Sequence, residues 1–312
     1  MSLPKELQHR PSVHQLCMGA FLQEIVPVGE HTTALPLVPL GCDTEAVYTA
    51  RYAREVVGAS VDEPAIASLR KQGADAHPVI AIVVRNRIDA APEDLERAAI
   101  PLLDRARAIL SWATGEVAEP FALVTAPTKD AYFRLTLEPS RRRQRLGFGN
   151  TGTDFRGQLH RLMTYAEEDE RFAFALSVYR DALREQNPEF RAARHFSCLE
   201  ALAYRIKDDD GTGQKSRQRV RKLLGLENGA MSRTSDGTNQ YEYDRVEIAG
   251  RIRDKLFHGA PFRPTEHLNE SAAKAYGHLL KHPHQLRDML QADCELEFTR
   301  WANGASRGQP TS

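Results

Sequence analysis

The chain has 312 residues, of which 41% are hydrophobic and 27% charged. This composition excludes a mainly disordered or low-complexity chain, and the length is enough for two domains. Its 42 basic and 42 acidic residues cancel, so any contact with nucleic acid must come from a local patch rather than from a global field.

Targeting and redox signals are sparse. The longest purely apolar run, residues 79–84, is far too short to cross a membrane, and the first residues lack the apolar stretch of a secretory signal. The cysteines are dispersed and form no CxxC pair; they are Cys17, Cys42, Cys198 and Cys294. These features predict a cytoplasmic protein with reduced thiols, no structural zinc and no membrane span.

The first part of the chain, residues 1–140, is expected to be an α+β domain. Short segments rich in β-branched or aromatic residues predict strands, at 46–52, 79–85, 121–125 and 132–137. Between two of them, apolar residues at helical spacing predict a helix that starts at Pro92 and stops at Gly115, with Pro101 as a possible kink.

A basic, glycine-rich linker is expected at 141–157, after which the pattern becomes helical up to residue 302, with a frayed tail at 303–312. The predicted fold class is therefore α+β, with a mixed N-terminal domain and an all-α C-terminal bundle. The bundle helices are expected at 158–186, 188–206, 215–224, about 241–258 and about 266–301. Asn187 and Pro188 predict the start of the second helix, Gly259 a left-handed cap after the fourth, and Pro283 a break in the last.

Two glycine-rich segments imitate nucleotide-binding motifs. The first, GFGNTG at 147–152, follows a run of arginines instead of the apolar strand that a dinucleotide fingerprint needs. The second, GTGQKS at 211–216, has the wrong spacing for a phosphate loop. Both are interpreted as loops, and no cofactor is predicted.

Three histidines, His278, His282 and His284, come close together in the sequence and invite a metal assignment. Pro283 disrupts the i, i+4 geometry and no cysteine is near in sequence, so surface histidines are the preferred interpretation. No metal site is predicted, and the sequence contains neither the GxSxG motif nor the HExxH motif of hydrolases.

One constellation carries chemistry, the segment RIRDKLFHG at 251–259. An arginine and a histidine at such a spacing also occur at Arg70 and His77, as chance predicts, so the context decides. Arg253 is followed by the polar Asp254, His258 is followed by glycine, the segment lies on a predicted helix, and an amphipathic helix with FSCLEAL at 196–202 precedes it.

Over roughly residues 158–300 the sequence resembles the HEPN domains, and within them the ApeA-like branch. The resemblance rests on a long first helix, the F-x-x-L-E-A-L core, a basic connecting helix and the ending R-polar-x3-H-G. It implies a helical bundle that commonly pairs, and a metal-independent RNA endonuclease with Arg253 and His258 in one cleft shared by two protomers. The resemblance also makes Asp254 a catalytic candidate, at the position where asparagine is commonest in the family.

The chemistry of RNA supports this expectation. The 2′-hydroxyl of RNA can attack its own phosphate if a group with a pKa near neutrality accepts the proton and a fixed cation stabilises the phosphoryl oxygens. Histidine and arginine supply these functions, and the planar guanidinium can bind two phosphate oxygens. A five-residue step on one helix separates the two side chains by about 140°, which favours a cleft at a helix end or one completed by a second subunit.

Further residues are assigned around this pair. Arg251 is a candidate second phosphate contact. The basic helix is a candidate track for single-stranded RNA, through Lys215, Arg217, Arg219, Arg221 and Lys222. The alternative for this helix is a solvated face that balances Asp208, Asp209 and Asp210. Glu200 is expected to pair with an arginine inside the bundle rather than to act as a catalytic acid.

The resulting prediction is an RNA endonuclease that dimerises through its C-terminal bundle, with an N-terminal domain that binds a regulatory protein or ligand. The resemblance implies a toxin or antiviral defence role. The alternative is a noncatalytic scaffold that binds RNA or a partner. Alanine at Arg253 or His258 is expected to abolish cutting without disturbing the fold, because a helix-end residue contributes little to a core.

Overall fold

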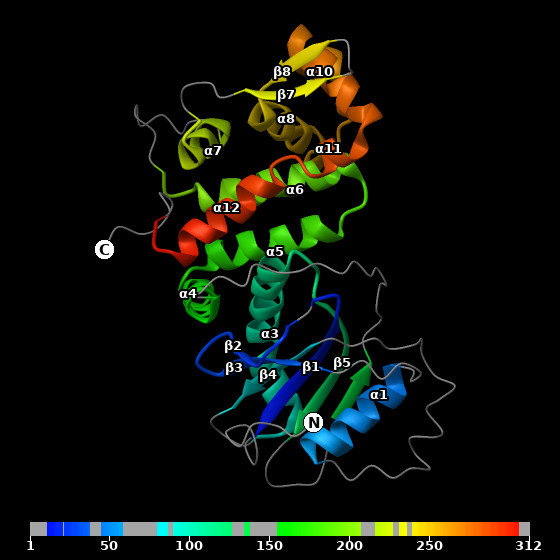
Figure 1. The fold of residues 1–312 in the computed structure, drawn as a ribbon, viewed down its shortest axis with the longest axis vertical. Helices are drawn as coiled ribbons and strands as arrows, with labels where there is room; N and C mark the ends of the chain where they lie inside the picture. Colours follow the sequence, from blue (N-terminus) through cyan, green and yellow to red (C-terminus); the bar gives the residue numbers. More distant parts are fainter. Residues whose placement is uncertain are drawn as a thin grey trace. The chain divides into compact units, whose positions relative to one another are not determined.

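The computed structural model describes residues 11–20, 22–37, 45–58, 80–86, 90–126, 134–137, 155–206, 216–226, 231–235 and 239–305. The chain divides into two compact units, Met1–Thr164 and Tyr165–Ser312. The first is built on an antiparallel sheet and the second is largely helical (Figure 1). The predicted α+β class is confirmed.

The sheet of the first unit has the strand order β2-β3-β4-β1-β5-β6, and all neighbouring strands are antiparallel. Its strands are β1 (Ser12–Met18), β2 (Val26–Pro27), β3 (Thr32–Pro36), β4 (Ile80–Arg85), β5 (Glu119–Ala126) and β6 (Arg134–Leu137). The first strand in sequence, β1, is therefore central in the sheet, where His14 lies opposite Val83 on one side and Val124 on the other.

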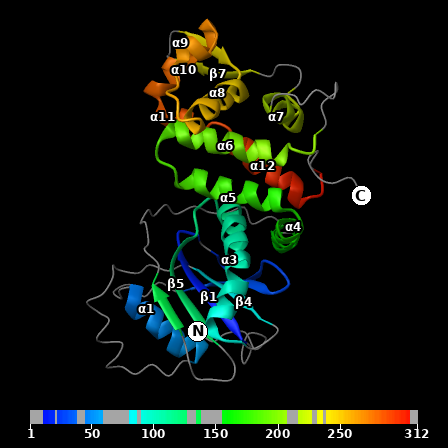
Figure 2. The same ribbon diagram turned by 180° about the vertical axis from the view of Figure 1, so that it is seen from behind.

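Helices cover both faces of this sheet (Figure 2). Helix α1 (Glu45–Tyr52), continued by the π-helical turn η2 (Ala53–Val57), packs on the face that carries Leu16, Val83 and Phe121. Helix α3 (Pro92–Thr114) packs on the opposite face, where Glu96 accepts a 2.7 Å hydrogen bond from Thr125. Because both faces are covered, every residue of β1 is buried.

The sequence-based prediction for this unit is partly wrong. Residues 46–52 form helix α1 and not a strand, because Tyr48 and Tyr52, one helical turn apart, both enter the core. Strands β1, β2 and β3 were not predicted. The other three predicted strands are confirmed as β4, β5 and β6, and α3 starts at Pro92, continues through Pro101 and ends before Gly115, whose φ is +70°.

The helices of the second half are α4 (Phe155–Glu168), α5 (Glu170–Arg184), α6 (Pro188–Leu202), α7 (Ser216–Leu224), α8 (Arg245–Phe257), α9 (Pro264–His267), α10 (Glu270–Lys281), α11 (Pro283–Arg287) and α12 (Gln291–Ala302). Helix α6 packs against α5, α7, α8, α11 and α12. The core of this unit is aromatic, with Phe172 packed between Trp301 and Phe298 and with Tyr179 against Phe298. Among the described helices, none is long and apolar enough to cross a membrane.

Local capping explains where the helices of this unit differ from the prediction. The expected single helix at 158–186 is two helices, because the Asp169 side chain accepts backbone hydrogen bonds from Arg171 and Phe172 and starts α5. The region expected to be all-α also contains a hairpin of β7 (Ser232–Ser235) and β8 (Gln240–Tyr243). The predicted starts at Asn187 and Pro188 and the break at Pro283 are confirmed.

His195 lies in the middle of this unit with no exposed surface. Its Nδ1 is 3.0 Å from the Met289 carbonyl oxygen, which fixes the proton of the neutral ring on Nδ1. Burial, reinforced by the positive charge of Arg191, lowers the pKa of His195 to about 3. The folded unit therefore holds this ring neutral under conditions in which the unfolded chain would protonate it.

This burial predicts acid sensitivity. Below the ordinary histidine pKa near 6.5 only the unfolded chain binds the proton, so the free energy of unfolding should fall by about 1.4 kcal/mol per pH unit, down to about pH 3. Urea unfolding between about pH 7 and pH 4 measures this slope, with Trp301 as the probe in a Trp112→Phe background. The variant His195→Asn keeps a donor for the Met289 carbonyl and should have a slope smaller by that amount. Equal slopes in variant and parent would contradict the prediction.

Candidate functional site

Helix α8 carries the predicted site and has well-defined ends. Asp244 caps its start, accepting hydrogen bonds from the backbone of Val246 and Glu247 at 2.9 and 3.0 Å. At the other end Gly259 has a φ of +69°, and the Ala260 backbone N–H donates to the Lys255 carbonyl at 2.9 Å. The predicted left-handed glycine cap is confirmed, and it directs the chain away immediately after His258.

The side chain of Arg253 is only partly exposed and packs against neighbouring helices. Its side chain is 17% exposed and its guanidinium carbon is 5.2 Å from the centre of the Phe196 ring. The guanidinium donates to Glu200 and to the Ser216 hydroxyl, the latter at 3.1 Å, and pairs with Asp254 at 3.0 Å. The expectation that Glu200 pairs with an arginine is confirmed. The contacts of Arg253 with Glu200, Ser216 and Asp254 indicate that this residue also stabilises the fold, which the sequence-based expectation did not include.

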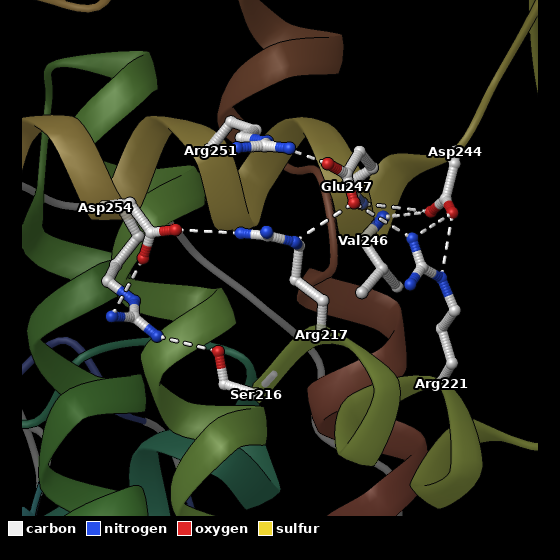
Figure 3. Close-up of polar contacts among 9 residues, drawn as sticks. Ser216, Arg217, Arg221, Asp244, Val246, Glu247, Arg251 and Asp254 are labelled. Atoms are coloured by element: carbon white, nitrogen blue, oxygen red, sulfur yellow. Dashed lines mark hydrogen bonds and ion pairs between the residues drawn. The ribbon is translucent and has the colours of Figure 1, made fainter. Parts of the chain in front are cut away.

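The Asp254 carboxylate joins two helices. One oxygen is 3.0 Å from Arg253 Nη1, and the other accepts a 2.8 Å hydrogen bond from Nη1 of Arg217 on α7. Arg217 also pairs with Glu247 through its Nε at 3.1 Å, so its side chain lies along α8 (Figure 3). Asp254 thus binds the arginine of the motif and an arginine of the basic helix at the same time.

Glu247 and Asp244 bind two further arginines, Arg221 of α7 and Arg251 of α8. Glu247 accepts from Arg251 at 2.8 Å and from Arg221 at 3.1 Å, and Arg221 also donates to Asp244 at 2.6 Å (Figure 3). Among the described residues, the network contains four arginines and four carboxylates, whose charges balance. Its members are Arg217, Arg221, Arg251, Arg253, Glu200, Asp244, Glu247 and Asp254.

The basic helix is thus only partly directed to solvent. Arg217 and Arg221 bind carboxylates of α8 and its cap, and Asp208, Asp209 and Asp210 lie outside the described residues. Arg219 and Lys222 are partly exposed, and Lys215 lies outside the described residues. Among the candidate RNA contacts of this helix, Arg217 and Arg221 are therefore already paired with carboxylates, whereas Arg219 and Lys222 are partly exposed to solvent.

His258 is exposed at the end of α8, where it is the residue after the last helical position. Its backbone N–H donates to the Leu256 carbonyl. Within the part of the chain that the structure describes, no hydrogen bond or ion pair joins its imidazole to Arg253. Phe257 beside it is 49% exposed. One chain therefore places the arginine inside the network and the histidine at the surface of the same helix end.

Gly250 allows Arg217 to lie across α8. A Cβ added to Gly250 would be 2.8 Å from Cγ and Cδ of Arg217 and 3.1 Å from Cε2 of Phe196. Arg217 is held by two carboxylates and Phe196 is fully buried, so neither can move away at low cost. A glycine inside a predicted helix is the sequence signal for such a close approach.

Alanine at Gly250 is expected to destabilise the second unit by about 1–2 kcal/mol, because the steric conflict exceeds the gain in helix propensity. Gly277 in α10 is the matched control, since nothing lies within 4 Å of its added Cβ. Gly277→Ala should stabilise the unit by up to about 1 kcal/mol. Urea unfolding monitored at Trp301 compares the two variants. Stabilisation by both would contradict the packing described for Arg217.

The three clustered histidines do not all lie at the surface. The ring centres of His278 and His282 are 4.5 Å apart and those of His282 and His284 are 6.0 Å apart. His278 is 6% exposed and stacks on Tyr241, so the surface interpretation is wrong for this residue. Among the residues that the structure describes, no group of three or more histidine, cysteine or acidic side chains is arranged to hold a metal ion.

Several sequence features of possible functional interest lie outside the described residues. They are the GFGNTG segment, residues 211–215 of GTGQKS, and the Arg70 and His77 pair. No family model, no curated protein and no solved structure matches the chain.

Proposed function

We propose that the chain is a metal-independent RNA endonuclease of the HEPN type. The observation that carries the proposal is the arrangement at the end of α8, where Arg253 is oriented by Glu200, Ser216 and Asp254 and His258 is exposed directly before the glycine cap. The pattern R-polar-x3-H-G thus coincides with a helix end at which a cation and an imidazole lie on neighbouring turns.

These two groups, with a proton from water, account for cleavage of the RNA by its own 2′-hydroxyl. His258 takes the proton of the 2′-hydroxyl as that oxygen attacks the adjacent phosphorus. The bond from phosphorus to the 5′-oxygen of the next nucleotide breaks, and this oxygen takes a proton from solvent water. Arg253 stabilises the charge that builds on the phosphoryl oxygens, and its planar fork favours two of them at once. The products are a 2′,3′-cyclic phosphate and a 5′-hydroxyl.

The test is incubation of purified protein with mixed RNA in the presence of EDTA. Cleavage at the rate seen in magnesium supports the proposal, because neither step uses a divalent ion. A protein that carries both Arg253→Ala and His258→Ala, prepared in parallel, controls for contaminating nucleases. Strict dependence on a divalent ion would contradict this mechanism.

We further propose that the active species is a homodimer joined near the end of α8. The five-residue step separates Arg253 from His258, and a two-fold axis beside the helix end would gather two arginines and two histidines around one phosphate. Phe257 is exposed next to His258, and a half-exposed aromatic residue is a typical anchor of such an interface.

The dimer is tested by light scattering or native mass spectrometry of the full chain. Phe257→Ser should shift the protein to the monomer and reduce cleavage with it. Phe174→Ser is the matched control, because Phe174 is 56% exposed on α5 and not on α8, the helix that carries Arg253. A wild-type protein that is monomeric and fully active at nanomolar concentration would refute the shared site while leaving the nuclease assignment open.

One observation favours the second candidate function, a noncatalytic scaffold that binds RNA or a protein. Arg253 is already neutralised by two carboxylates, and arginines of bundle helices in such networks can serve structure alone. A scaffold predicts RNA or partner binding that is insensitive to His258→Ala and accompanied by no cleavage. The EDTA assay therefore separates the two candidates.

A further inference from the structure

We propose that Arg217 and Arg253 form one phosphate-binding site, and that the side chain of Asp254 occupies this site until an RNA phosphate replaces it. The inference rests on the proposed function for the identity of the ligand. It assigns Arg217, from a different helix, to the same phosphate as Arg253, and it makes Asp254 a competitor of the substrate.

The geometry of Asp254 is that of a bound oxyanion. Its two oxygens each face a different guanidinium, Arg253 Nη1 at 3.0 Å and Arg217 Nη1 at 2.8 Å. Two non-bridging oxygens of a phosphodiester present the same pair of acceptors, and arginine binds carboxylate and phosphate with the same fork. The two cations are therefore already spaced for one anion that carries two oxygens.

The exposure of the three side chains fits a replaceable occupant. Asp254 is 34% exposed, whereas Arg217 is 12% and Arg253 is 17% exposed. The carboxylate is the solvent-facing member and can turn into water, where it is fully hydrated. The guanidiniums are the buried members and would stay in place.

Other contacts hold the arginines when the carboxylate turns away. Glu247 binds Nε of Arg217 at 3.1 Å, and Gly250 leaves the space in which the stem of Arg217 lies. Glu200 and Ser216 bind Nη2 of Arg253. The donors that face Asp254 are thus oriented independently of it, which is the condition for a preorganised anion site.

Asp254→Asn tests the exchange, because asparagine keeps the shape and removes the negative charge that competes with phosphate. The probe is a fluorescent RNA with 2′-O-methyl riboses, which binds but cannot be cut, and the readout is fluorescence anisotropy on the full chain. The variant should bind about tenfold more tightly than the wild type, the effect of one charge-assisted hydrogen bond. Arg217→Gln in the Asp254→Asn background should abolish the gain.

Asp293→Asn is the matched control. Asp293 also pairs with an arginine of α8, Arg245, at 2.7 Å, so the variant makes the same change in net charge at a different place. It should bind the probe like the wild type. An equal gain in both aspartate variants would overturn the proposal in favour of a general charge effect, and weaker binding by Asp254→Asn would show that Asp254 only positions the arginines.

Inorganic phosphate separates this inference from the proposed function. If the chain binds no RNA, phosphate should still raise the thermal unfolding midpoint of Asp254→Asn more than that of Asp293→Asn. That result would keep the anion site and reject the nuclease. Cleavage of RNA by the wild type together with an unchanged affinity of Asp254→Asn would reject the anion exchange and keep the nuclease.

Discussion

Arg253→Ala should reduce RNA cleavage by about 100-fold or more, because the variant lacks the cation that stabilises the phosphoryl oxygens. It should also destabilise the second unit by about 1–2 kcal/mol, since Glu200 and Asp254 lose their shared partner but are each about one-third exposed and can be rehydrated. Initial rates on a defined RNA and urea unfolding at Trp301 measure the two effects in one preparation.

Arg251→Ala is the control for this variant. Arg251 is 42% exposed and pairs with Glu247 one turn away on the same helix, so its removal should change stability by at most about 0.5 kcal/mol. Arg253→Lys keeps the charge without the fork and should lie between the wild type and Arg253→Ala in rate. A folded Arg253→Ala protein with wild-type activity would place the site elsewhere.

His258→Ala is expected to lower the cleavage rate by about 100-fold to 10,000-fold, the usual contribution of a general base. The imidazole is exposed after the last turn of α8, so the free energy of unfolding should change by less than about 0.5 kcal/mol. Loss of activity without loss of stability distinguishes this residue from Arg253.

His160→Ala is the matched control, because His160 is an exposed histidine on α4. It should leave both rate and stability unchanged. Full activity of His258→Ala would show that another group accepts the proton. The exposed position also leaves His258 free to meet the phosphate from either protomer of the proposed dimer.

Helix ends with strong local signals could be predicted from the sequence. Gly259 ends α8, because its positive φ turns the chain out of the helix. Asn187 and Pro188 start α6, because the Asn187 side chain accepts hydrogen bonds from backbone N–H groups of the first turn. Asp169 uses the same mechanism, but the apolar pattern continues across it, so the break between α4 and α5 was missed.

The missed elements of the first unit depend on tertiary contacts. Strand β1 is buried on both faces, so it has no alternation of polar and apolar residues. Its polar His14 is accommodated by hydrogen-bonding contacts with Ser12 and Tyr52, the latter from α1. The sequence of such a strand has no period of two residues, so the strand can be assigned only from its pairing with neighbouring strands.

The composition of the candidate site could be predicted only in part. The sequence places Arg253, Asp254 and His258 at one helix end, because the three residues are close together in the sequence and follow from one helix prediction. The acidic partner Glu200 and the cation Arg217 come from α6 and α7, and no local spacing encodes those pairings. The charge run of α7 was recognised, but which of its arginines bind carboxylates depends on how α7 packs against α8.

The end groups of the RNA products test the central claim most directly. A defined RNA and its counterpart with a single 2′-deoxyribose at the cut position are incubated with the full chain in EDTA, and the products are identified by mass spectrometry. The account predicts a 2′,3′-cyclic phosphate and a 5′-hydroxyl from the first RNA, and an intact bond at the same position in the second. Products with a 5′-phosphate and a 3′-hydroxyl, or cutting beside the 2′-deoxyribose, would contradict attack by the 2′-hydroxyl.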